Sequence, residues 1–168
     1  MTFPMIHSIS RTRALSAFFA VLAGVSLALS PMTAFAADGS PLITKLSAHD
    51  AATTLDRLAG ILEKKGITIF ARVDHAKGAK SVELDLPPTE LLVFGNPKLG
   101  TPLMQANRGI GIDLPMKALA WTDVDGKTYL SYTDPAKLSA RWGIGDRAAV
   151  FKKMTGALDK MTTAATSE

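Results

Sequence analysis

Residues 95–101 contain the residue types that could bind an anion at the start of a helix. Asn96 is a good N-cap, and Pro97 suits the first helical position. The first N–H groups of a helix have no acceptor within it, so a strand running into a helix here could direct them at an anionic ligand. Lys98 and Thr101 could assist. The alternative is that Asn96 and Pro97 only start the helix.

A second candidate site combines Arg72, Asp74 and His75 at the carboxyl end of a predicted strand. Open α/β sheets commonly bind ligands at that end of their strands. An imidazole ordinarily changes its charge near neutral pH, so His75 could act as an acid, a base or a metal ligand. Arg72 could bind an anionic substrate. The alternative is a histidine that caps the next helix or donates to a loop.

Metal and hydrolase chemistry have fewer matching residues. A metal site needs about three or four converging ligands, and Asp50, next to His49, is expected to serve in a helix cap. Met104 could join His75 in binding copper, but methionine at helical spacing is more often a core residue. There is no G-x-S-x-G motif of the serine hydrolases. We therefore predict no metal and no cofactor, with haem or copper handling as a weaker alternative.

Aromatic residues form a third candidate. Trp121, Tyr129 and Tyr132 lie on a predicted hairpin, and Trp142 follows it. Exposed together, they would bind a small ligand or a second copy of the chain, because Trp and Tyr contribute strongly to binding energy. If the hairpin is an edge of the sheet, its unpaired backbone favours association, so a homodimer is predicted as possible.

The first half of the domain alternates strands and helices, which must position these residues. Apolar residues and turn signals predict strands over 42–46, 67–73 and 90–94. Ser47, with Asp50 three residues later, predicts a helix N-terminus, and helices are also expected over 76–85 and 97–107. Period-two alternation makes 67–73 a core strand, with Ile67, Ile69, Ala71 and Val73 on one face.

The second half begins with a hairpin. Strands are expected over 114–122 and 127–133, joined by Asp125-Gly126, a dipeptide typical of tight hairpin turns. A short helix to Trp142 and a final helix follow, with a polar tail from Thr162. The order predicts an α+β (two-layer α/β) fold. Its mixed sheet of four or five strands has helices mainly on one face, with parallel pairing expected from the crossovers before the hairpin.

The N-terminus predicts export. Arg11 and Arg13, an apolar run of 16 residues over 14–29, and Ala34-Phe35-Ala36 have the order of a cleavable signal peptide. The run is shorter than the about 20 residues of a membrane-spanning helix. We expect a signal peptide (1–36), a linker and first strand (37–44), a main domain (45–143), and a C-terminal helix with its tail (144–168).

Composition narrows the classes of function. There is no cysteine, which excludes disulfides, thiolate metal sites and a lipid-carrying cysteine. Removing the signal peptide takes away two arginines and no acidic residue, so the net charge falls from +4 to +2. A near-balanced charge without a basic stripe argues against nucleic acid as a partner. The mature chain is predicted to be periplasmic or secreted, without a stable membrane anchor.

Several motifs of this chain resemble those of one family in the same order. They are Phe94-Gly95-Asn96-Pro97, Gly100-Thr101-Pro102-Leu103-Met104-Gln105, His75, Asp113-Leu114-Pro115, Asp125-Gly126 and Tyr132-Thr133-Asp134-Pro135. Over residues 45–143 the chain therefore resembles the DUF302 family of bacterial and archaeal domains of unknown function. The resemblance implies a compact α/β domain with a sheet backed by helices. It implies no activity and no catalytic residue.

Two hypotheses about function follow. The first is a non-enzymatic module that binds a small ligand or a protein partner near His75 and Asn96. The second is a small enzyme that uses His75 as acid or base, with Arg72 or Lys98 binding an anionic substrate. The missing catalytic constellation favours the first.

Overall fold

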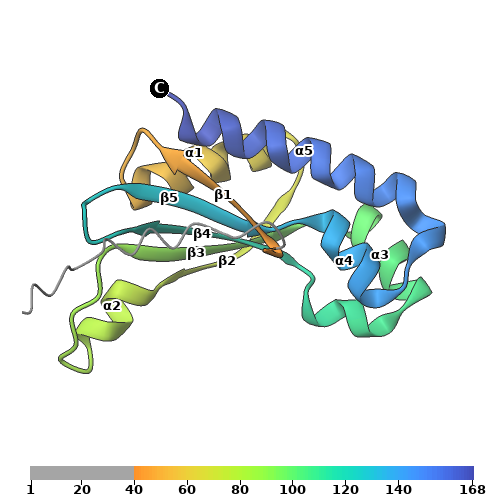
Figure 1. The fold of residues 1–168 in the computed structure, drawn as a ribbon, viewed down its shortest axis with the longest axis horizontal. Helices are drawn as coiled ribbons and strands as arrows, with labels where there is room; N and C mark the ends of the chain where they lie inside the picture. Colours follow the sequence, from red (N-terminus) through yellow and green to blue (C-terminus); the bar gives the residue numbers. More distant parts are fainter. Residues whose placement is uncertain (1–39) are drawn as a thin grey trace, which may run out of the picture. The chain divides into compact units, whose positions relative to one another are not determined.

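The computed structural model describes residues 40–168, and the predicted signal peptide lies outside the described residues. Figure 1 shows the arrangement of the elements. The strands are β1 (Leu42–Ser47), β2 (Thr68–Asp74), β3 (Thr89–Gly95), β4 (Met116–Thr122) and β5 (Thr128–Thr133). The α-helices are α1 (Ala51–Lys64), α2 (His75–Lys80), α3 (Pro97–Ala106), α4 (Pro135–Trp142) and α5 (Ala148–Thr166), with short 3₁₀ helices η1 (Arg108–Ile112) and η2 (Gly145–Arg147).

The fold is α+β, as predicted. The five strands form one sheet in the order β1-β5-β4-β3-β2, and α1 and α5 cover the same face of it (Figure 1). The core lies between that face and the two helices. Most of the core is built from leucine and alanine, including Leu55, Leu58, Leu62, Leu92, Ala118, Ala120 and Leu130. One end of it contains methionine and phenylalanine side chains instead.

The predicted parallel pairing is wrong, because all four strand pairs are antiparallel. A crossover helix must carry the chain back along the whole length of a strand. α2 has six residues, not the ten expected over 76–85, and is only about 9 Å long, whereas a seven-residue strand spans about 23 Å. The chain therefore leaves β2, turns through α2 beyond the end of the sheet, and returns as an antiparallel neighbour.

The hairpin does not lie at an edge of the sheet. β4 and β5 pair through Asp123 and Gly126 as a tight hairpin, as predicted, but β5 also pairs with β1 and β4 with β3. The strand from the start of the domain thus covers the hairpin's outer side. The edges of the sheet are β1 and β2.

β2 is an edge strand with a bulge, not the predicted core strand. Its pairing with β3 shifts register between Ile69 and Ala71, so Phe70 is an extra residue. A bulge of this kind reverses the alternation beyond it. Ile69 faces the helices, as predicted, while Ala71 and Val73 lie on the other face and are exposed.

α1 begins one turn later than the Ser47 pattern predicts. Asp50 is the N-cap, and its carboxylate accepts from the Thr53 N–H at 2.7 Å. This backbone hydrogen bond stabilises the charged form and lowers the pKa of Asp50. Ser47 ends β1, and its hydroxyl accepts from the His49 N–H. Leu55, Leu58 and Leu62 recur at the helical period and are buried.

The predicted polar tail from Thr162 is wrong, since α5 continues to Thr166. Thr162 and Thr166 are buried, and each hydroxyl donates to a backbone carbonyl one turn earlier. The guanidinium of Arg57 on α1 donates to the carbonyls of Ala164, Ala165 and Ser167. These bonds satisfy carbonyl groups that a helix end leaves without partners.

Candidate functional site

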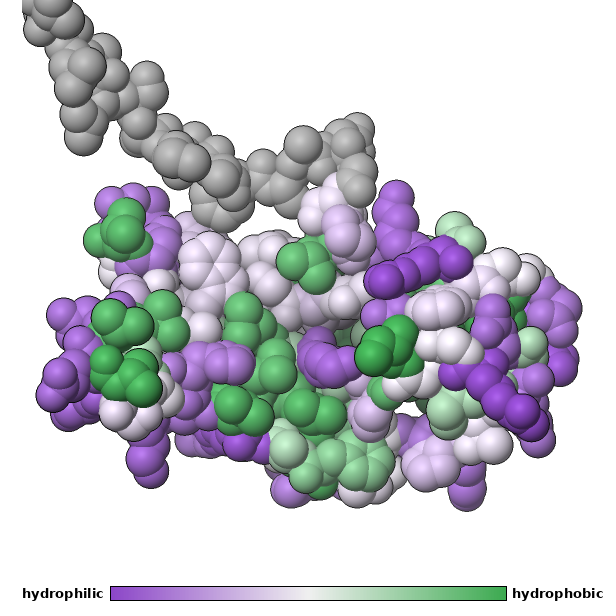
Figure 2. All heavy atoms as spheres, turned by 90° about the horizontal axis from the view of Figure 1, so that it is seen from below, coloured by the Kyte–Doolittle hydropathy of each residue, from purple (hydrophilic) through white to green (hydrophobic). Residues whose placement is uncertain are grey.

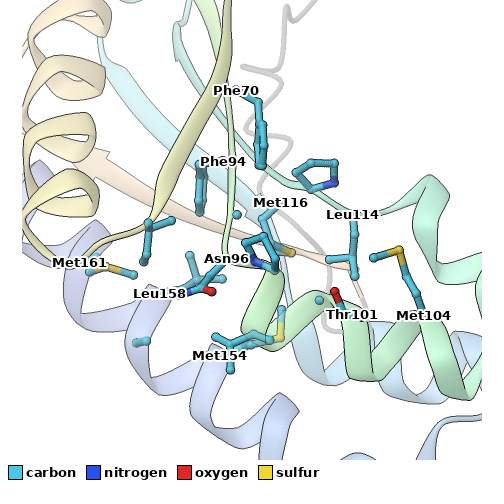
Figure 3. A pocket seen from close by; sticks show the side chains of 17 residues that line it. Phe70, Phe94, Asn96, Thr101, Met104, Leu114, Met116, Met154, Leu158 and Met161 are labelled. Carbon is cyan, nitrogen blue, oxygen red and sulfur yellow. The ribbon is translucent and has the colours of Figure 1, made fainter.

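An apolar cavity of about 230 Å³ lies where β2, β3 and β4 meet α3 and α5. Figure 3 shows its labelled side chains, which come from these elements and from the connections at Asn96 and Leu114. Asn96 and Thr101 are its two polar lining residues. The apolar lining residues are Ile67, Phe70, Phe94, Pro97, Leu99, Met104, Leu114, Pro115, Met116, Met154, Ala157, Leu158 and Met161, and two glycines, Gly95 and Gly100, complete the wall.

Phe70, the bulged residue of β2, lies at the outer side of this cavity. Its side chain is 53% exposed, although it lines the cavity together with the buried Phe94. A Cβ placed on Gly95 would lie 3.4 Å from the Phe70 ring and 3.4 Å from Pro115 Cβ. The Phe70 ring thus lies within van der Waals reach of the end of β3. The bulge therefore places a half-exposed aromatic side chain in the cavity wall.

All four methionines of residues 40–168 line this cavity: Met104, Met116, Met154 and Met161. Met116, Met154 and Met161 are buried, while Met104 is partly exposed. Methionine is flexible and polarisable, so it adapts to ligands of different shape. The Leu and Ala core under the middle of the sheet lacks this composition. The cavity end is therefore built from more adaptable side chains than the rest of the core.

The predicted anion site at Asn96 has no unsatisfied helix N–H group at its start. Asn96 caps α3 as predicted, with its side-chain oxygen accepting from Lys98 N–H at 2.9 Å. The N–H groups of Leu99 and Gly100 donate to the Asn96 carbonyl at 2.9 and 3.0 Å. Since Pro97 has no N–H, every early donor is occupied. Asn96 and Thr101 line the apolar cavity, whereas Lys98 is exposed outside its lining.

Arg72 lies in an ion-pair cluster between β2, β3 and α1. It donates to Asp56 and, at 2.7 Å, to Glu90, and also to the Ala52 carbonyl at 3.1 Å. Partial burial acts to lower the pKa of Arg72, but the hydrogen bonds to Asp56 and Glu90 outweigh it and raise that pKa overall. The side chain is thus engaged in holding edge strand β2 to α1.

His75 is exposed at the first position of α2 and does not line the cavity. Asp74 caps this helix by accepting from the Lys77 N–H at 2.7 Å, so it does not orient the imidazole. The other described histidine, His49, contacts the Ser167 carbonyl at 2.9 Å. Residues 40–168 contain no group of three His, Asp or Glu side chains placed to hold a metal ion. The structure brings Asn96 and Thr101 together and leaves Arg72, His75 and Lys98 apart.

The aromatic residues fall into two groups. Trp121 and Tyr129 stack with their ring centroids 4.8 Å apart. Trp142 instead holds α4 against η1, where its Nε1 donates to Asp113 Oδ2 at 2.7 Å. Tyr132 lies in the core, and burial raises its pKa.

Phe70, Phe94 and Met116 line the cavity but were not predicted as site residues. Apolar side chains carry no spacing signal that distinguishes a cavity wall from a core. The one feature of the sequence that indicates the cavity is its methionine content, because the methionines between residues 104 and 161 all line it.

Within residues 40–168, no helix combines the length and the apolar character needed to cross a bilayer. A family model described as "Domain of unknown function DUF302" matches residues 43–161 of the chain. A solved structure, that of an uncharacterised conserved protein DUF302 from Bacillus stearothermophilus, is similar with a TM-score of 0.59 and 19% sequence identity, over 75% of this chain and 95% of that chain. At this identity the similarity concerns the fold alone.

Two curated relatives are named fluoride-specific ion channel FluC 1. The protein from Brucella suis biovar 1 (strain 1330) is 51% identical over 106 residues, which are 63% of this chain and 42% of that protein. The protein from Brucella abortus biovar 1 (strain 9-941) is 51% identical over 106 residues, 63% of this chain and 39% of its own length. The chain thus spans about two-fifths of the length of these relatives.

Proposed function

The chain belongs to the DUF302 family, and from that premise we propose that it is an exported module that binds a small apolar ligand in the methionine-lined cavity. The observation that carries the proposal is the composition of the cavity lining. Of the residues within 40–168 that line the cavity, only Asn96 and Thr101 have polar side chains. Ligand sites are typically apolar with a few polar groups that fix orientation. Export is proposed from the signal-like order of residues 1–36.

An enzyme acting through His75 gains no support from this geometry. His75 lies on α2, Arg72 is held by Asp56 and Glu90, and Lys98 projects from α3 outside the cavity lining. General acid–base chemistry needs such groups within hydrogen-bond reach of one substrate. We carry no ion-channel activity over from the Brucella relatives, because the channel name belongs to proteins of which this chain spans two-fifths.

Filling the cavity from Gly100 should weaken ligand binding. A Cβ at Gly100 would lie 3.7 Å from Leu114 Cδ1 and 4.0 Å from Met104 Cε, so a side chain fits there and occupies the cavity. Gly100→Leu should weaken binding of a neutral naphthylamine probe by about tenfold or more. The leucine side chain takes up space that the probe would fill, and each methylene-sized group of the probe that is no longer buried loses about 0.8 kcal/mol of binding free energy. Fluorescence titration measures the affinity.

Gly60→Leu is the matched control, because Gly60 lies within α1, has no heavy atom within 4 Å of an added Cβ and does not line the cavity. Equal probe affinity for the two variants would reject the cavity as the site.

The full-length chain should be expressed in its native host, recovered from the periplasmic fraction, and its N-terminus determined. An unprocessed N-terminus in the cytoplasmic fraction would reject export.

A second candidate function, self-association, is favoured by the face of the sheet opposite α1 and α5, here called the open face. Strand registers align Val73, Leu91 and Leu119 in one row of this face, and Trp121, Tyr129 and Leu46 in the next. Figure 2, seen from below, shows apolar side chains gathered in the middle of the molecule. A solvated sheet face is ordinarily polar.

Charge on the strands has the reverse of the usual distribution. Lys45, Arg72 and Glu90 lie on the helix-covered face, where they form ion pairs. By the alternation of the described strands, Lys117 is the single charged residue of the open face. Ser131 accepts from Trp121 Nε1 at 3.0 Å and shares a hydrogen bond with Thr44 at 2.9 Å. The face can therefore be covered without leaving these polar groups unsatisfied.

We propose that a second copy of the chain covers the open face. Five strands of six or seven residues offer roughly 500 Å² per protomer, and stable interfaces bury about 800 Å² per partner. The loop after α2 carries exposed Val82, Leu84 and Leu86, and α2 lies on the side opposite α1 and α5 (Figure 1). In a twofold dimer, each such loop would add area by packing on the partner.

The test places charges on the open face at positions where the fold tolerates them. The wild-type full chain should be a dimer by light scattering. Leu46→Glu/Val73→Glu, at positions 62% and 41% exposed, should raise the dissociation constant about 100-fold. The control Val124→Glu changes a residue of the β4–β5 turn that is 96% exposed and should leave it unchanged. A wild-type monomer, or a dimer unaffected by Leu46→Glu/Val73→Glu, would overturn the proposal.

A further inference from the structure

A second hollow, rich in lysine, lies directly beside the apolar cavity. Four lysines line it, here called the lysine cluster: Lys65, Lys152, Lys153 and Lys160. Ala157 and Met161 line both the lysine hollow and the apolar cavity. The two hollows therefore share a wall.

The same two chain segments supply the residues of both hollows. Lys65 follows α1, and Ile67, two residues later, lines the apolar cavity. On α5, Lys153 and Ala157 are four residues apart and so lie on the same side of the helix. The positions of the charges relative to the cavity are thus set by one helix and one short turn.

The lysine cluster has no neutralising partner within residues 40–168. The ion pairs of this part of the chain involve Lys45, Arg72, Arg141 and Arg147, and none of the four lysines. Like charges close together repel, and an anion bound among them relieves this repulsion. All four lysines are exposed, so their interaction with an anion is sensitive to salt.

We infer that the ligand is a single-chain amphiphile with an anionic head, a carboxylate or a phosphate, held by the lysine cluster while its apolar chain enters the cavity. This inference rests on the proposed function and adds the charge and shape of the ligand. A volume of about 230 Å³ lies below the roughly 300–1,000 Å³ of sites for drug-sized ligands. One medium-length chain fits this space better than a two-chain lipid.

Ligands with the same chain and different heads test the inference on the full-length protein. Decanoate, decyl phosphate and decanol should each displace the neutral naphthylamine probe, with the anions kept below their micelle concentrations and decanol below its solubility limit. At about 50 mM salt, the better of the two anions should bind at least tenfold tighter than decanol, and this difference should shrink at about 500 mM salt. The ranking of decanoate and decyl phosphate identifies the head group.

Variants locate the head group. Lys153→Gln/Lys160→Gln should lower the affinity for the tighter anion about tenfold, because the two substitutions remove half the charge of the cluster. The affinity for decanol should stay within twofold. Lys77→Gln/Lys137→Gln removes two exposed lysines from α2 and α4 and should change neither affinity.

The outcomes separate this inference from the proposed function. If decanol binds as tightly as both anions, or if Lys153→Gln/Lys160→Gln binds them like wild type, the anionic head is rejected and the apolar cavity stands. If neither the probe nor any of the three decyl compounds binds, the proposed function and this inference both fall.

Discussion

Replacing Gly109 with alanine should lower the free energy of unfolding by about 2–3 kcal/mol, measured by urea denaturation. A Cβ at this position would lie 2.5 Å from Cζ3 of the Trp142 ring and 3.2 Å from its Cε3. The ring cannot move aside easily, because its Nε1 donates to Asp113 and the Trp142 carbonyl accepts from Asn107 Nδ2 at 3.0 Å. Backbone and ring meet here because residue 109 has no side chain.

The control for this prediction is Gly156→Ala in α5, where an added Cβ meets no heavy atom within 4 Å. That substitution should raise stability by about 0.5–1 kcal/mol, since alanine favours the helix over glycine. In a Trp142→Leu background, the cost of Gly109→Ala should fall below about 0.5 kcal/mol. A cost that is unchanged in that background would show that the ring is not its cause.

Oxidising the methionines of the cavity should reduce the affinity for the neutral probe by about tenfold or more. A sulfoxide places a strongly polar oxygen in an apolar site, and burying an unpaired polar group costs about 1–3 kcal/mol. The chain has no cysteine, so peroxide does not act on a thiol. Met104, the partly exposed member, should react first. Mass spectrometry of peptides measures the oxidation of each methionine, and probe titration of the same samples measures the affinity.

Leucine at all four positions is the control, because Met-to-Leu exchange nearly conserves volume. Wild-type protein should recover its affinity on treatment with methionine sulfoxide reductases, and the leucine variant should bind the probe before and after peroxide. Loss of affinity in the leucine variant as well would assign the effect to damage elsewhere.

The local elements of this protein follow from its sequence because their signals lie within a few residues. Asn96-Pro97 starts α3 as predicted, and Asp134-Pro135 starts α4 in the same way, each through a side-chain oxygen that accepts from the helix. Gly126, with φ of 77°, forms the predicted hairpin turn. The spaced leucines of α1 are buried as their helical period predicts.

The candidate site was predicted only in part. Asn96 and Thr101 line the cavity, but the polar side chains singled out with them are elsewhere: Arg72 in an ion-pair cluster, and His75 and Lys98 exposed. Polar residues are the ones that a sequence indicates as site candidates, because few of them are needed for core packing. The cavity is instead made of apolar residues, whose sequence pattern is that of any core.

By itself, the sequence determined the α+β class, the starts of α3 and α4 and the hairpin, since capping, turn geometry and helical period act over short distances. Only the tertiary structure decided the antiparallel strand order, the bulge at Phe70 and the gathering of the four methionines with the lysine cluster beside them. These depend on pairing between strands far apart in the chain, such as β1 with β5, and on the packing of α5 against the sheet. No short stretch of residues encodes such contacts.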